Sequence, residues 1–112
     1  MVMNSHTAVV ERNVTWQGAF ASEPYEVGWA SEAIIFLRTL EATGASSEPL
    51  RADVQISPDG MHWCDEGTSL SLSVKPGVTF AKVKHFGGWL RIVGTLPPGV
   101  SIKLILYYSL KG

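Results

Sequence analysis

The regular alternation of side-chain character near the C-terminus restricts the fold of this chain more than any other feature. Every second position there is apolar: Ile102, Leu104, Leu106, Tyr108 and Leu110. Positions two apart share one face of a β-strand, so this pattern predicts a strand with one buried face. The intervening positions are Lys103, Ile105, Tyr107 and Ser109. This second face is too apolar for a plainly solvated one, so we expect the strand to be central in its sheet or part of an interface.

Two further segments alternate in the same way. In the first, Ala52, Val54 and Ile56 are expected to face inward, while Arg51, Asp53 and Gln55 face outward. In the second, Leu70, Leu72 and Val74 alternate with Ser69, Ser71 and Ser73. Glycine and proline turn signals recur at short intervals between these segments, which is typical of sandwiches and barrels. We therefore predict an all-β, two-sheet antiparallel sandwich, jelly-roll-like, with about eight strands.

The chain length of 112 residues fits a single domain. We expect residues 15–112 to form the sandwich and residues 1–14 to form an N-terminal arm that is flexible or contributes to an interface. The stretch 31–43 is ambiguous on pattern. Ile34, Leu37 and Leu40 have helical spacing, with Gly44 as a C-cap, yet 33–40 also fits a strand buried on both faces. The β character of the rest of the chain favours the strand.

The tetrapeptide Ser57-Pro58-Asp59-Gly60 is a strong turn signal. Proline presets φ at the second position, aspartate bonds to the turn through its side chain, and glycine accepts a positive φ. We expect this turn to join the strand that ends at Ile56 to a short strand holding residues 62–64, with Trp63 close to the sheet edge.

Composition and charge argue against several function classes. The net charge is −1 and the nine Lys and Arg residues are scattered, which disfavours nucleic-acid binding. No apolar run approaches the ~20 residues needed to span a bilayer, and residues 1–13 lack the apolar segment of a signal peptide. Cys64 is the single cysteine, so an intrachain disulfide or a cysteine-based zinc site is excluded.

Candidate catalytic and metal-binding groups do not form a recognisable motif. His6, His62 and His85 lack zinc-ligand spacing, and Asp59, Asp65 and Glu66 lack the alternating oxygen ligands of a calcium loop. Cys64 and His62 could share a strand face, but no orienting third residue or oxyanion loop can be assigned to them. We therefore assign no catalytic, cofactor-binding or metal residues, and we expect that the protein is not an enzyme and needs no cofactor.

The aromatic residues are the remaining candidates for function. Core packing, a protein interface and a sugar-stacking platform all suit such rings, because they combine flat apolar faces with a polar tip. The set comprises Trp16, Trp29, Trp63, Trp89, Tyr25 and Tyr107. If the function lies on the surface, we expect contacts from four of them: Trp16, Trp29, Trp89 and Tyr107.

The order of motifs carries a resemblance. The segment 54–63, Val-Gln-Ile-Ser-Pro-Asp-Gly-Met-His-Trp, precedes the segment 88–93, Gly-Trp-Leu-Arg-Ile-Val. Together with the final apolar strand, these segments resemble small β-sandwich structural proteins of bacteriophage and prophage virions, over roughly residues 15–112. The hairpin from Ser57 to Trp63 also resembles that of discoidin-like and carbohydrate-binding sandwiches. The resemblance implies a sandwich fold first and a role in assembly or surface binding second.

These observations lead to a function hypothesis and one alternative. The first is a non-enzymatic structural protein, a subunit or decoration of a phage-like or other protein-shell particle, located in a virion or a cytoplasmic particle. It would act by packing as a homo-oligomer, with shell or tail proteins as partners and with neither nucleic acid nor membrane bound. The alternative is a stand-alone carbohydrate-binding module for surface attachment, with a glycan as the partner.

Overall fold

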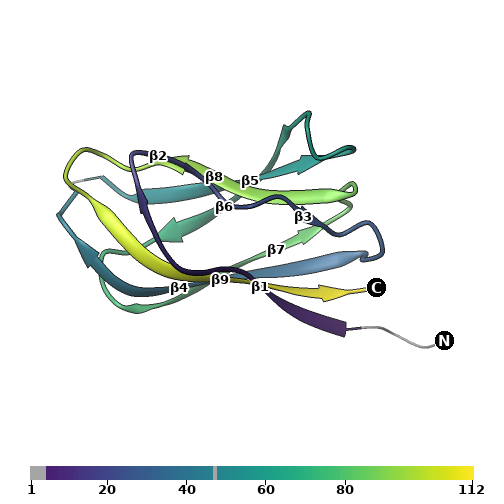
Figure 1. Cartoon of the computed structure of the whole chain (residues 1–112), viewed down its shortest axis with the longest axis horizontal. Coiled ribbons are helices and arrows are strands. Elements are labelled where there is room, and N and C mark those ends of the chain that lie inside the picture. Colours follow the sequence, from purple (N-terminus) through teal and green to yellow (C-terminus); the bar gives the residue numbers. More distant parts are fainter. Residues whose placement is uncertain (1–4, 47) are drawn as a thin grey trace.

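Two antiparallel sheets face each other in the computed structural model, which describes residues 5–46 and 48–112 (Figure 1). The first sheet has four strands in the order β1 (Ser5–Gln17), β9 (Ser101–Lys111), β4 (Glu32–Thr43) and β7 (Gly77–Lys84). The second has the order β2 (Ala19–Ala21), β8 (Trp89–Thr95), β5 (Leu50–Ser57) and β6 (Cys64–Leu72), and β3 (Tyr25–Glu26) also pairs with β8. The predicted all-β sandwich is confirmed.

Strands β2 and β3 act as one interrupted strand along β8. Both pair with β8 on the edge that β5 leaves free. Between them, the Ser22 N–H donates to the Ile92 carbonyl at 2.8 Å, and the Ile92 N–H donates to the Ser22 hydroxyl at 2.8 Å. A side-chain oxygen thus replaces a backbone acceptor, two residues before Pro24. Counted as one strand, β2 and β3 give eight strands in jelly-roll order, as expected.

The ambiguous stretch 31–43 forms a strand, β4, and no helix. Ala33, Ile35 and Leu37 are fully or almost fully buried, and they alternate with more exposed neighbours. β9 lies on one side of β4 and β7 on the other, so both edges of its backbone are paired. These two long-range pairings stabilise the strand over the helix that the local spacing also allowed.

The core lies between the inner faces of the two sheets. All five alternating apolar side chains of β9, residues 102 to 110, are 0% exposed, and β9 is central in its sheet, as predicted. In the opposite sheet Ala52 and Val54 are fully buried, and Ile56 is half-buried against the core. Leu70 and Leu72 are buried as well.

The Tyr108 hydroxyl is a polar group buried inside this core. Within the described residues it has no hydrogen-bond partner, and the Tyr25 ring packs edge-on against the Tyr108 ring with centroids 5.8 Å apart. Burial raises the pKa of Tyr108 well above its usual range, so the phenol stays neutral and the core holds no charge there.

The N-terminal residues do not form a separate arm in the described part of the chain. Residues 5–14 lie within β1, which pairs with β9 from Ser5 to Gln17, so the expected boundary at residue 14 falls inside a strand. Residues 1–4 lie outside the described residues. No helix long and apolar enough to cross a membrane occurs in the described ranges.

Candidate interaction surface

An aromatic row crosses the outer face of the four-stranded sheet. It consists of Val9 on β1, Tyr107 on β9, Phe36 on β4 and Phe80 on β7, which lie opposite one another in register. Phe80 is 57% exposed and Val9 is 40% exposed. The Phe36 and Phe80 rings are tilted against each other, with centroids 6.1 Å apart. These side chains point away from the core, because each alternates with inward-facing neighbours along its strand.

Further apolar side chains extend this row on both sides. Ile34 lies two residues before Phe36 on β4, and Val78, which is 64% exposed, lies two residues before Phe80 on β7. Ile105 lies two residues before Tyr107 on β9 and is half-buried. An outer sheet face that meets only water usually carries polar side chains, so a contiguous apolar patch of this kind is a candidate interaction site.

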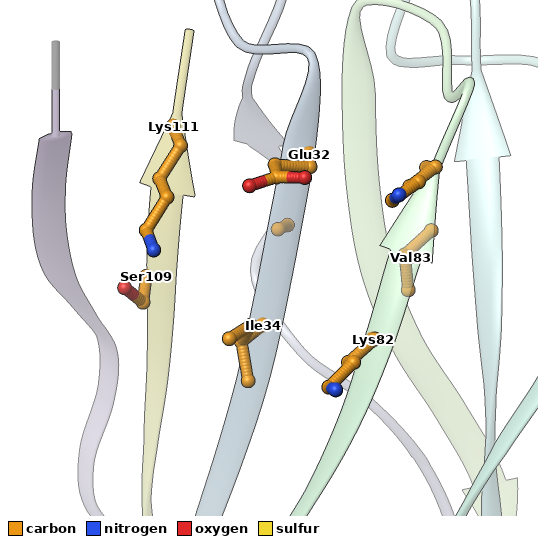
Figure 2. Close-up of a pocket in the computed structure, with 8 residues that line it drawn as sticks. Glu32, Ile34, Lys82, Val83, Ser109 and Lys111 are labelled. Atoms are coloured by element: carbon orange, nitrogen blue, oxygen red, sulfur yellow. The ribbon is translucent and has the colours of Figure 1, made fainter. Parts of the chain in front are cut away.

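A basic groove lies next to the aromatic row, at the end of the sheet where β9 finishes. Figure 2 shows Lys82 from β7, Lys111 from β9 and Glu32 from β4 around it, and Lys84 also lines it. The groove encloses about 220 Å³ and is floored in part by Ile34. None of its three lysines forms an ion pair within the described residues. Three ammonium groups around one carboxylate favour an anionic group in this groove.

The outer face formed by β4, β7 and β9 is basic. The outward positions of β4, β7 and β9 hold five cations and two carboxylates: Arg38, Lys82, Lys84, Lys103 and Lys111, with Glu32 and Glu41. One ion pair lies among them, between Lys103 Nζ and Glu41 Oε1 at 3.9 Å. The face therefore carries +3, while the whole chain carries −1, which leaves −4 for the remaining residues. We call this surface, with its aromatic row and groove, the basic face.

The four aromatic residues expected at the surface do not converge on one site. Tyr107 lies in the aromatic row, while Trp29 is 45% exposed and lies beside Gly112. Trp89 is on β8, in the other sheet, and is half-buried. Trp16 is 4% exposed and stacks on Phe20 with centroids 4.1 Å apart, so it serves the core and is not available as a surface contact. Trp16 is buried, contrary to the prediction, because it lies on the face of β1 that points to the core.

The predicted turn residues form a hydrogen-bonded loop between β5 and β6. The Ser57 hydroxyl accepts from the N–H groups of Asp59 and Gly60 at 3.2 and 2.9 Å. Asp59 Oδ1 accepts from the N–H groups of Met61 and His62, both at 2.9 Å. Because Asp59 takes up these two N–H groups, the chain does not return to strand at His62 as predicted, and β6 begins only at Cys64.

Two tryptophan rings pack against this loop. Gly60 has a φ of +80°, and a Cβ placed there would lie 3.2 Å from Cε2 of Trp89, so any other residue would be strained and would press on that ring. The Arg91 guanidinium lies 4.3 Å from the Trp63 ring centroid, and Arg91 Nε donates to Gln55 Oε1 at 2.8 Å. Each of these rings therefore has one face occupied by the protein itself.

The bonds to Asp59 predict an acid-sensitive loop. The N–H of His62, the His62 ring at 2.6 Å and the N–H of Met61 hold the pKa of Asp59 well below its usual range. A lowered pKa contributes stability above the unfolded value of about 4, and this contribution is lost as the pH falls. Asp59→Asn should therefore be less stable than the wild type at pH 7, with a difference that shrinks toward pH 2.5. Urea denaturation at several pH values measures this, and a pH-independent difference would contradict it.

The remaining candidate groups stay apart. Among the described residues, no three His, Cys, Asp or Glu side chains gather closely enough to hold a metal ion. Cys64 is an exposed free thiol, and the His62 ring bonds to Asp59. His6 lies on β1 and His85 in the connection after β7, so the three histidines come from separate parts of the fold.

The residues that sequence reasoning missed are Val9, Phe36 and Phe80. The sequence could have indicated Phe36, because in a strand it lies on the face opposite Ile35 and Leu37.

In comparisons with known proteins, the chain matches no protein-family model and no curated protein.

Proposed function

We propose that this chain is a non-enzymatic structural protein, a subunit or decoration of a phage-like or other protein-shell particle, which acts by oligomeric packing of its sandwich. The aromatic row on the basic face is the observation that carries this proposal. Phe80 and Val9 expose apolar surface on the outer face of the four-stranded sheet, and covering such surface is favourable by about 25 cal/mol per Å². A second protein surface is the natural cover for it.

The size of the basic face suits a protein partner. Its strands have 8 to 13 residues. At about 3.3 Å per residue and about 4.8 Å between strands, four such strands present roughly 700 Å². A standard protein–protein interface buries about 800 Å² on each partner. Jelly-roll sandwiches build both viral capsids and lectins, so the fold is compatible with the proposal but does not decide it.

The alternative is a stand-alone carbohydrate-binding module, and exposed Trp29 is the observation that favours it. A sugar platform needs aromatic rings with free faces that converge on one site. The rings of Trp63 and Trp89 are each covered on one face, by Arg91 and by Gly60. Because the other surface rings do not gather around Trp29, we rank packing above glycan binding.

The proposal predicts self-association through the aromatic row. Light scattering after size exclusion, over a wide concentration range, should give a mass above the 12.2 kDa monomer. Replacing Val9 and Phe80 together with serine should weaken this association about tenfold or more, because it removes apolar contact from both sides of the row. Ser71→Ala, on an exposed position of the other sheet, is the matched control and should leave it unchanged.

Two results would count against this function. A wild-type protein that stays monomeric at the highest attainable concentration would contradict oligomeric packing. A glycan array with specific hits, which Trp29→Ala abolishes, would favour the carbohydrate-binding module instead.

A further inference from the structure

The connection between β5 and β6 is the most prominent protrusion of the molecule. In Figure 1 this teal segment stands clear of the two sheets. Residues 57–67, which we call the acidic tip, carry three carboxylates, on Asp59, Asp65 and Glu66, and no Lys or Arg. Met61 is 75% exposed at the tip, the most exposed large apolar side chain among the described residues. The tip thus presents an exposed apolar side chain on a segment with three carboxylates: Asp59 in the turn, where it bonds to His62, and Asp65 and Glu66 at the start of β6.

The acidic tip is held in one shape before any partner binds. The backbone N–H groups of Gly60 and Met61 donate to the Ser57 hydroxyl and the Asp59 carboxylate, and Gly60 packs on the Trp89 ring. A preorganised loop loses little conformational entropy on binding, so an exposed side chain on it contributes more of its contact energy to affinity. Methionine suits such contacts because its side chain is flexible and polarisable.

The acidic tip and the basic face are complementary in charge and in apolar character. The tip carries −3 and the face carries +3. On the face, the groove at Lys82 and Ile34 lies two residues along the strands from the row at Phe80 and Phe36, roughly 7 Å away. A single protrusion can therefore reach the aromatic row with its apolar group and the groove with its carboxylates.

The same charges disfavour packing of two basic faces against each other. In a twofold face-to-face dimer, the lysine groove of one copy would lie over cationic residues of the other, with +3 on each surface. Juxtaposed like charges destabilise an interface. The tip and the face lie on different surfaces of the molecule, so a contact between them joins unlike surfaces.

We infer that the acidic tip of one copy docks on the basic face of a second copy, with Met61 against the aromatic row and the carboxylates toward Lys82, Lys84 and Lys111. This inference rests on the proposed function and specifies its packing mode. Such a head-to-tail contact leaves one free tip and one free face on every pair, so it extends into closed rings or open filaments. Both are forms in which shell and tail proteins are built.

Two double variants test this packing mode. The variant Lys82→Glu with Lys84→Glu has a defective face and an intact tip. The variant Met61→Ser with Asp65→Asn has a defective tip, with no new cation to attract the other variant's glutamates, and an intact face. All four side chains are exposed, so both variants should fold, which thermal unfolding checks. Sedimentation velocity should show each variant alone to be monomeric at concentrations where the wild type assembles.

Mixing the two variants gives the decisive result. The intact tip of the first and the intact face of the second can form one native contact, so an equimolar mixture should yield a dimer that grows no further. Lys75→Glu with Glu48→Lys, on exposed positions outside the tip and the face, is a charge-reversal control that keeps the net charge at −1, and it should assemble like the wild type. Salt should weaken wild-type assembly, because it screens the charges across the contact.

The failures of the inference and of the proposed function are distinguishable. If either double variant assembles like the wild type, or if the mixture stays monomeric, the head-to-tail contact is wrong while oligomeric packing stands. If the wild type itself stays monomeric at every concentration, both fail.

Discussion

Replacing Gly44 with alanine should destabilise the sandwich by about 3 kcal/mol or more. The added Cβ would both strain the backbone conformation and overlap neighbouring backbone atoms. Gly44 follows β4 with a φ of +92°, a conformation that costs an L-residue roughly 1–2 kcal/mol. A Cβ there would overlap the carbonyl oxygen of Gly99 and lie 3.0 Å from the Cα of Val100. Both obstacles are backbone atoms, so the connection between β8 and β9 would have to move.

Two other glycines separate the two contributions. Gly67 has a φ of +106° and nothing within 4 Å of its Cβ position, so Gly67→Ala should show conformational strain alone. Gly77 has neither a positive φ nor a close neighbour, so Gly77→Ala should be close to neutral. Urea denaturation of the three variants should therefore rank Gly44→Ala as the least stable, with Gly67→Ala between. Equal losses at Gly44 and Gly67 would show that the overlap with Gly99 has no effect.

The parts of the fold that sequence predicted are those where local pattern and tertiary structure agree. The alternation in β9, β5 and β6 depends only on which face meets the core, and burial follows it closely, except at the end of β5, where Ile56 is half-buried and Ser57 is buried. The stretch 31–43 needed more, because its helical spacing was overruled by pairing with β7 and β9. The interruption between β2 and β3 depends on the Ser22 hydroxyl bonding to Ile92, which no local pattern indicates.

The interaction surface was harder to predict than the fold for the same reason. Tyr107 was expected at the surface because the second face of its strand is unusually apolar. The other members of the aromatic row come from three strands far apart in sequence, and only the register between strands places them opposite one another. Trp16 was expected at the surface but is buried, because aromatic character alone does not decide between core and surface. Its parity along β1 does.

Neighbouring residues on β9 should separate stability from association. Leu106 is 0% exposed between the sheets, so Leu106→Ala should lower the free energy of unfolding by about 2–5 kcal/mol. Tyr107 points outward into the aromatic row, and Tyr107→Thr replaces it with another residue that favours strands. That variant should lose less than about 1 kcal/mol of stability but weaken self-association about tenfold or more. Urea denaturation and sedimentation velocity measure the two quantities on the same samples.

The opposite pattern would assign Tyr107 to the fold and not to the partner surface. If Tyr107→Thr lost as much stability as Leu106→Ala while association stayed unchanged, the outer face of β9 would have a structural role only. If Leu106→Ala instead remained folded and weakened association per folded molecule, the contact would depend on the shape of the core. The expected separation follows from alternation, because a strand sends successive side chains to opposite faces. In β9 one of those faces closes the core, and the other is free to hold a second copy.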